Sequence, residues 1–313
     1  MRTFAVKALR LVIIMLALTF LSFAAQDLIP GDAAQLIGFG ADPAKIEEIR
    51  QDLRLDDPMP VRYLAWLGDF VTGDLGQYYR VNGDPAEQVT TALPISLQLM
   101  LYTQILALLI AIPLGVITAY RANGLFDKMS NLGAFLAFSV PGFVIAYLLK
   151  KYLALDNKLL PDSGWVKLSD DLVEHFRHAV LPVLTLTFGQ IAVYFRLLRS
   201  DMIATLQEDF ITMAKAKGMP ARRILFRHAL RPSSLTLLTV AGLNIGTLIS
   251  TAVLVENIFD IPGMGTLLIS GVLQYEYPAT QSFIAIIGLM FVLINYSVDF
   301  LYTVLDPRIR HAR

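Results

Sequence analysis

Six apolar blocks alternate with polar segments along the chain. They cover residues 9–25, 94–120, 131–153, 182–198, 235–255 and 279–304. Each block is close to the roughly 20 apolar residues that a helix needs to cross the ~30 Å hydrocarbon core of a bilayer. Because an isolated apolar segment can satisfy its backbone polar groups in lipid only as a helix, the pattern predicts an all-α integral membrane protein with six transmembrane helices.

The blocks divide the chain into four parts. These are a first transmembrane helix, an extracytoplasmic segment, a core with helices two to six, and a short tail, at residues 1–26, 27–93, 94–304 and 305–313. Basic residues precede the first block and small residues follow it, so this block fits a cleaved signal peptide as well as a retained helix. The extracytoplasmic segment fits a small folded cap or a substrate-handling element equally well.

Prolines predict helix starts and changes of direction. Asp42 followed by Pro43 is typical of an N-cap and the first position of a helix. Pro113 in the second block, and Pro141 with Gly142 in the middle of the third, predict kinks because proline removes a backbone N–H group. A kink at Pro141 is equally consistent with a helix that lines a cavity and with a helix that bends to pack against its neighbours.

The composition excludes several classes of protein. The chain is 55% hydrophobic and 17% charged, whereas soluble domains have about 25% charged residues. It has no cysteine, which excludes disulfides and thiolate metal sites. Its histidines are scattered, and the phosphate-binding pattern G-x-x-x-x-G-K-S/T does not occur. We therefore expect a chain that is not an enzyme and that binds no cofactor or metal itself.

The net charge is zero, but the charges are unevenly distributed. Lysine and arginine are absent from the segment 256–278 and gather in four other segments, 1–10, 121–130, 199–231 and 308–313. Because positive charge marks the cytoplasmic side of short loops, both termini are predicted to be cytoplasmic. Lys150 and Lys151 at an outer helix end are exceptions, and their ammonium groups are expected to snorkel to the membrane interface.

Residues 209–232, here called the basic loop, separate the fourth and fifth blocks. The spacing of Leu206, Phe210 and Ala214 predicts a short helix with an apolar stripe. Gly218 is expected to adopt the left-handed conformation that ends such a helix.

A second short helix is predicted between Pro220 at its start and Pro232 at its end. Its apolar face has helical spacing, at Ala221, Ile224, Leu225 and Ala229. The residues alone favour contact with anionic lipid head groups and docking of a soluble partner equally. They disfavour a nucleic-acid surface, because aromatic residues for base stacking are nearly absent.

Specific motifs favour the docking interpretation. The basic loop contains AKAKG at residues 214–218 and RHALRP at residues 227–232. Other motifs are spread along the chain: Pro30-Gly31-Asp32, Gly73-Asp74-Leu75-Gly76, Ser139-Val140-Pro141, Val255-Glu256, Ile261-Pro262-Gly263-Met264-Gly265, Asp299 and Leu305-Asp306-Pro307-Arg308-Ile309-Arg310. As a set they resemble the dipeptide, oligopeptide and nickel permease family of type I ABC importers. The segment 212–218 resembles the EAA loop of such permeases, although Thr212 or Met213 replaces its opening acidic residue.

The resemblance implies a type I importer permease fold in the inner membrane of a prokaryote, with the first helix retained. It implies four further subunits or partners: a second homologous permease that completes a heterodimer, two ATPases that bind ATP and Mg, and an extracytoplasmic solute-binding protein. Coupling to the ATPases is implied for the loop 200–234. Its candidate residues are Thr212, Met213, Ala214, Lys215, Ala216, Lys217, Gly218, Arg222 and Ile224. No residue is singled out for the substrate path.

The implied cargo is a dipeptide or oligopeptide, and nickel chelates or glutathione are alternatives within the family. A secondary transporter driven by an ion gradient is less favoured, because it would need ionisable residues buried at mid-membrane. The candidates for such residues, Asp299 and Arg196, are interpreted as structural or interfacial.

Overall fold

The computed structural model describes residues 2–29 and 31–305, with side chains described for residues 9–29 and 31–298. Within this part the chain is helical and contains no strand. Contacts divide it into two compact units, Met1–Ser96 with Pro262–Leu293 and Leu97–Ile261 with Ile294–Arg313. Pro30, the side chain of Asp299 and the predicted tail from residue 306 onward lie outside the described residues.

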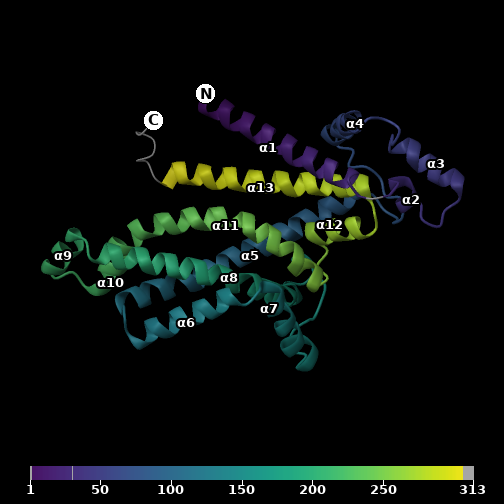
Figure 1. Ribbon diagram of the computed structural model, residues 1–313. Coiled ribbons are helices and arrows are strands. Elements are labelled where there is room, and N and C mark those ends of the chain that lie inside the picture. Colours follow the sequence, from purple (N-terminus) through teal and green to yellow (C-terminus); the bar gives the residue numbers. More distant parts are fainter. Residues whose placement is uncertain (1, 30, 306–313) are drawn as a thin grey trace. The chain divides into compact units, whose positions relative to one another are not determined.

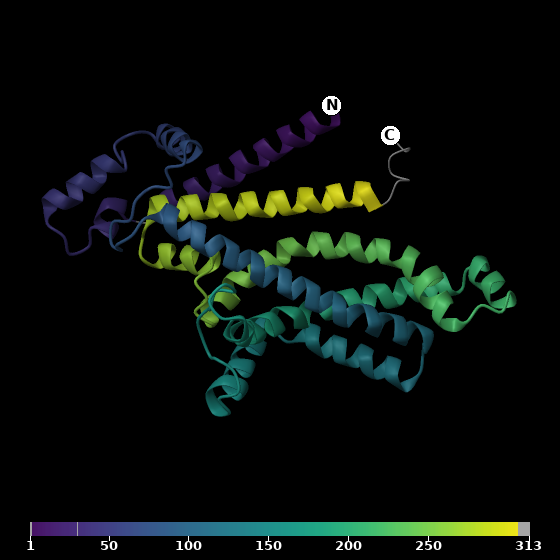
Figure 2. The same cartoon turned by 180° about the vertical axis from the view of Figure 1, so that it is seen from behind.

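Five helical stretches have the length and apolar composition of membrane spans: α1 (Arg2–Asp27) within Leu9–Asp27, α5 (Pro85–Tyr120), α8 (Leu172–Leu206), the stretch Ala221–Ile258 that includes α11 (Leu230–Ile258), and α13 (Tyr277–Leu305) within Tyr277–Val298. The bent pair formed by α6 (Leu125–Ser139) and the stretch Gly142–Asp156 would make a sixth. The all-α class and the apolar blocks predicted from the sequence are therefore confirmed. The chain is drawn in Figures 1 and 2.

The third predicted helix is broken rather than kinked. It forms α6, α7 (Gly142–Leu149) and the π-helical segment η1 (Lys150–Asp156), with a bend of 97° at the break. Val140 has the extended conformation φ −92°, ψ 124°. The proline ring disfavours the α conformation for the residue before it, and Pro141 has no N–H group to continue the hydrogen bonds of the helix. The helix therefore breaks at this point. At Pro113, in contrast, α5 continues without a break.

Two helices begin earlier than the apolar pattern predicts. The side chain of Asp84 accepts a hydrogen bond from the Ala86 N–H at 2.8 Å, and α5 begins at Pro85. Asp171 caps α8 in the same way, through the N–H groups of Val173 and Glu174, so that α8 begins at Leu172. In both cases the helix begins at a polar N-cap residue several positions before the apolar block, so the apolar pattern alone places the helix start too late.

The first unit contains α1, three short helices and the beginning of α13. The short helices are α2 (Ala33–Ile37), α3 (Pro43–Asp52) and α4 (Met59–Thr72). The predicted helix start at Asp42 and Pro43 is confirmed. Helix α1 packs against α4, and Gln281 of α13 binds α1 by donating to the Thr19 carbonyl at 2.8 Å and accepting from Ser22 at 2.8 Å.

The first unit also holds a helix that the apolar pattern missed. Helix α12 (Met264–Leu273) lies in the segment predicted as an outer loop, and its ten residues are too few for a membrane span. Glu276, which follows α12 and is 1% exposed, accepts hydrogen bonds from the N–H groups of residues 79–81. This carboxylate therefore attaches the loop before α5 to the loop before α13.

The second unit is organised around α8. This helix packs against α6, α7 and α11, and Figures 1 and 2 both show α6, α8 and α11 side by side. Close approach of helices through small residues, predicted for the fifth apolar block, occurs at Gly242, where an added Cβ would lie 2.0 Å from Cγ1 of Val298. The Nζ of Lys150 donates to the carbonyl of Ile258 at the end of α11, at 2.6 Å.

Candidate functional site

The first half of the basic loop forms helix α9 (Asp209–Ala216), which ends at a glycine as predicted. The Gly218 N–H bonds to the Lys215 carbonyl at 2.9 Å, and the Met219 N–H bonds to the Ala214 carbonyl at 3.2 Å. This pair of bonds is a Schellman motif, which satisfies carbonyls at the end of a helix. Gly218 has φ +70°, so the predicted left-handed conformation is confirmed.

The second half of the basic loop differs from the prediction. Pro220 is the N-cap of α10 (Ala221–Arg223), and α10 continues through the π-helical segment η2 (Ile224–Ala229) into α11. The predicted helix end at Pro232 is wrong, because Pro232 lies inside the first turn of α11. A proline is tolerated near the start of a helix, and a π-helical turn relieves its clash with the preceding turn. The loop is therefore one short helix, a glycine turn and the extension of a membrane span.

The basic loop is anchored in the core of its own unit. Ile211 and Ala214 of α9 are 0% and 6% exposed, and they belong to one apolar cluster with Ile224 and Ala229 of η2 and Met202 of α8. The predicted stripe of Leu206, Phe210 and Ala214 is therefore wrong in part. Leu206 belongs to α8, and Phe210 is exposed.

The candidate coupling residues separate into two groups. Ala214 and Ile224 are buried within this chain and support the loop from inside, so neither presents its side chain at the surface. The others are exposed: Thr212, Met213, Lys215, Ala216, Lys217, Gly218 and Arg222. Sequence reasoning did not place Phe210 and Phe226 at this surface, although both are about half exposed, at 46% and 53%. An aromatic residue at helical spacing is usually interpreted as core, and only the fold shows which face it occupies.

Two polar contacts connect the helices that support the basic loop. The hydroxyl groups of Thr205 at the end of α8 and Ser233 of α11 lie 3.0 Å apart. Arg199 of α8 donates to both carboxylate oxygens of Asp127 in α6, at 2.5 Å and 2.6 Å. The Asp127 side chain is 3% exposed, so this bidentate ion pair is largely removed from solvent. The helices beneath the loop are therefore linked by directional contacts as well as by apolar packing.

Polar residues also connect the helices of the second unit. Tyr194 donates to Gln104 at 3.1 Å, and Asn244 donates to Gln190 at 3.4 Å. Hydrogen bonds of this kind hold helices together in membranes. Arg196 lies over the ring of Phe138, with its guanidinium carbon 5.2 Å from the ring centre. Among the described residues, no group of three or more histidine, aspartate and glutamate side chains could hold a metal ion.

Comparison with known families identifies two matching regions. Residues 111–311 match the model described as "Binding-protein-dependent transport system inner membrane component". Residues 1–85 match the model described as "Binding-prot-dependent transport system membrane comp, N-term". The first match contains the basic loop and its supporting helices, and the second contains α1 to α4.

Curated relatives match over nearly their whole length. The oligopeptide transport system permease protein AppB of Bacillus subtilis is 35% identical over 95% of this chain and 96% of its own. The dipeptide transport system permease protein DppB of Alkalihalophilus pseudofirmus is 31% identical over 99% of this chain and 100% of its own. A probable peptide ABC transporter permease of Sinorhizobium fredii is 33% identical over 91% of each chain.

A solved structure supports the fold independently. A chain of the inward-facing MetNI methionine ABC transporter superposes with a TM-score of 0.58 at 14% identity, covering 70% of this chain and 96% of that chain. At this identity the similarity concerns the fold alone, which is that of a type I importer permease. With the family matches and the relatives, it leads to one conclusion: the chain belongs to the family of inner-membrane permease components of binding-protein-dependent ABC transport systems.

Proposed function

We propose that this chain is a permease subunit of an ATP-driven importer of short peptides, and that the basic loop couples it to cytoplasmic ATPase subunits. The observation that carries the proposal is the exposed face of α9, held on a buried base of Ile211 and Ala214. The relatives named for oligopeptide and dipeptide transport support the peptide class.

Coupling requires a surface element that moves together with membrane helices. Helix α9 packs on η2, and η2 is continuous with α11. A displacement of α9 by an ATPase would therefore be passed to α11 through packed side chains, because close-packed interiors transmit strain. Lys215, Lys217 and Arg222 give the exposed face a positive charge, which favours encounter with an acidic partner surface.

The membrane orientation and the subunit composition follow from the same proposal. The positive charge of the basic loop favours its placement in the cytoplasm, with both termini on the same side. We propose a second, homologous permease subunit as the partner in the membrane, two ATPases that bind ATP and Mg, and an extracytoplasmic solute-binding protein. This chain would form half of the path and perform no chemistry itself.

The test replaces Gly218 with valine. A valine at φ +70° is strained by about 1–2 kcal/mol, and its branched side chain would open the Schellman turn that sets the direction after α9. ATP-driven uptake of a labelled dipeptide into proteoliposomes holding the complete transporter should fall strongly, while ATPase activity becomes independent of the solute-binding protein.

Gly40→Val is a matched control. Gly40 has φ +86° and, like Gly218, open space around an added Cβ, but it lies in the first unit. The control should keep uptake near the level of the unmodified protein. Normal ATP-driven uptake by the Gly218→Val transporter, with assembly unchanged, would contradict the proposed coupling role.

A further inference from the structure

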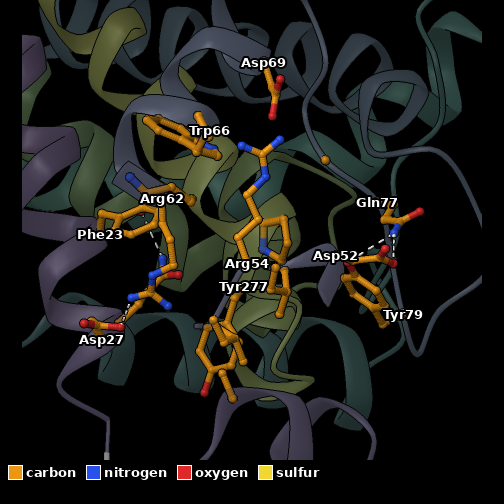
Figure 3. A pocket seen from close by; sticks show the side chains of 18 of the residues that line it. Phe23, Asp27, Asp52, Arg54, Arg62, Trp66, Asp69, Gln77, Tyr79 and Tyr277 are labelled. Carbon is orange, nitrogen blue, oxygen red and sulfur yellow. Dashed lines mark hydrogen bonds and ion pairs between the residues drawn. The ribbon is translucent and has the colours of Figure 1, made fainter. Parts of the chain in front are cut away.

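A pocket outside the coupling surface lies within the first unit. Its volume is about 450 Å³, and its walls come from the end of α1, the segment after α3, helix α4, residues 74–79 and the start of α13. Figure 3 shows that aromatic and charged side chains face it together. Pockets for small ligands usually have volumes of about 300–1,000 Å³, so this one has room for a ligand of modest size.

Most charges in the pocket already have partners in the chain. Asp27 forms an ion pair with Arg62, and Asp52 accepts a hydrogen bond from Gln77 at 3.3 Å. The same amide of Gln77 also donates to the Tyr79 hydroxyl at 3.1 Å. Burial raises the pKa of Tyr79, although the hydrogen bond with Gln77 opposes that shift. These contacts connect the polar groups to one another, although Asp52 and Gln77 remain exposed to solvent.

Two opposite charges remain unpaired in the same pocket. Arg54 and Asp69 are both exposed, and their side chains form no hydrogen bond or ion pair with the part of the chain that the structure describes. In Figure 3, the guanidinium of Arg54 projects toward Asp69. The guanidinium of Arg62, which also lines the pocket, pairs with Asp27 and lies over the ring of Phe23, while its Nε is buried without a hydrogen-bond partner.

The unpaired groups specify the chemistry of a ligand. An ammonium group would be attracted by the carboxylate of Asp69, and a carboxylate by the guanidinium of Arg54. Trp66 and Tyr277 supply aromatic surface, on which both apolar side chains and cations are stabilised. A ligand with only positive charge would leave Arg54 unpaired, and a ligand with only negative charge would face the carboxylates of Asp52, Asp69 and Asp74.

We propose that this pocket binds a small amphoteric molecule of the short-peptide class, through a free ammonium group at Asp69 and a free carboxylate at Arg54. The requirement for both charges follows from the pocket, whereas the short-peptide class rests on the proposed function. The pocket would hold a peptide on the first unit, whereas the coupling surface belongs to the second. It is therefore a binding site in addition to any path through the membrane.

The test uses the fluorescence of Trp66 in the full chain, reconstituted in lipid nanodiscs without ATPases or ATP. The chain has two tryptophans, so the Trp165→Phe protein reports on Trp66 alone. Titration with dialanine should change the emission saturably. N-acetyl-dialanine lacks the ammonium and dialanine amide lacks the carboxylate, so each should bind more than about tenfold more weakly, the loss expected for one charged hydrogen-bonded contact.

Arg54→Gln and Asp69→Asn, each in the Trp165→Phe background, should weaken dialanine binding by a similar factor. Matched controls are Arg80→Gln and Asp57→Asn, which change charges in the same unit outside the pocket and should leave binding unchanged. Three results would overturn the proposal: no saturable emission change, equal binding of the blocked peptides, or equal competition by glycerophosphoethanolamine, which would identify a lipid head group as the ligand.

This binding measurement and the uptake measurement fail separately. If dialanine does not bind but ATP-driven uptake is intact, the proposed binding site is refuted and the proposed function stands. If dialanine binds saturably but the transporter imports no peptide, the proposed function is refuted and the proposed binding site stands.

Discussion

The ion pair between Asp127 and Arg199 gives the sharpest test of how the helices below the basic loop are held. Both guanidinium contacts are short, and the Asp127 side chain is 3% exposed, whereas that of Arg199 is 21% exposed. Asp127 also accepts a hydrogen bond from the Asn123 N–H at 2.8 Å and one from the Asn131 amide at 2.7 Å. Removing the charge of Asp127 therefore leaves Arg199 largely buried without its counter-ion.

Asp127→Asn should lower the free energy of unfolding by about 3 kcal/mol, the loss typical when one partner of a buried ion pair is removed. Arg199→Met should have a similar effect. The double variant should lose about 2 kcal/mol less than the sum of the single losses, because neither charge is then left unpaired. The assay is reversible unfolding in mixed detergent micelles, followed by circular dichroism.

Glu174→Gln is the matched control. Glu174 pairs with Arg177 in the same helix α8, at 2.6 Å, but the side chains are 38% and 46% exposed. An exposed pair contributes less than about 1 kcal/mol, because solvent screens it. If Asp127→Asn costs no more than Glu174→Gln, or if the two losses in the double variant simply add, the buried pair does not link α6 and α8 as inferred.

Two further predictions concern stability. Gly242→Ala should lower the free energy of unfolding by about 1–3 kcal/mol, because the new Cβ would meet Val298 at 2.0 Å. Gly133→Ala is the control and should have little effect, because the space around its added Cβ is open. Equal thermal midpoints for the two variants would contradict the close packing of Gly242 against Val298. Burial, with Glu276 and Asp84 contributing, raises the pKa of Tyr78 to about 12. The pKa of this tyrosine in the unfolded chain is about 10, so the free energy of unfolding should stay constant below pH 10 and fall as the pH rises from about 10 to 12. The fall should be shallower in Tyr78→Phe, and an unchanged slope in that variant would contradict the prediction.

The sequence predicted the features that depend on short stretches of chain. Whether an apolar block crosses a membrane depends on its own side chains and length, so the spans could be recognised without the fold. The left-handed turn at Gly218 was predictable for the same reason, since it is set by one residue and the helix before it. The break at Pro141 was indicated by local chemistry, but not the direction that the chain takes afterwards.

Predictions failed where a residue's surroundings come from distant parts of the chain. Pro232 was expected to end a helix, yet the π-helical segment before it and packing against α8 let the helix continue. Phe210 and Ala214 share a helix face in sequence, but only Ala214 meets the core. Propensity and spacing describe a helix in isolation, whereas burial is decided by the helices that pack on it.

The sequence by itself therefore determined the class of this protein, its apolar spans and the motifs of its family. Tertiary structure decided which coupling candidates reach the surface, which helices Asp127 and Arg199 join, and that a pocket exists. The walls of that pocket range from Phe23 to Gln281. No periodicity connects residues so far apart, because their proximity arises from packing of α1, α4 and α13 within one unit rather than from any local preference of the chain.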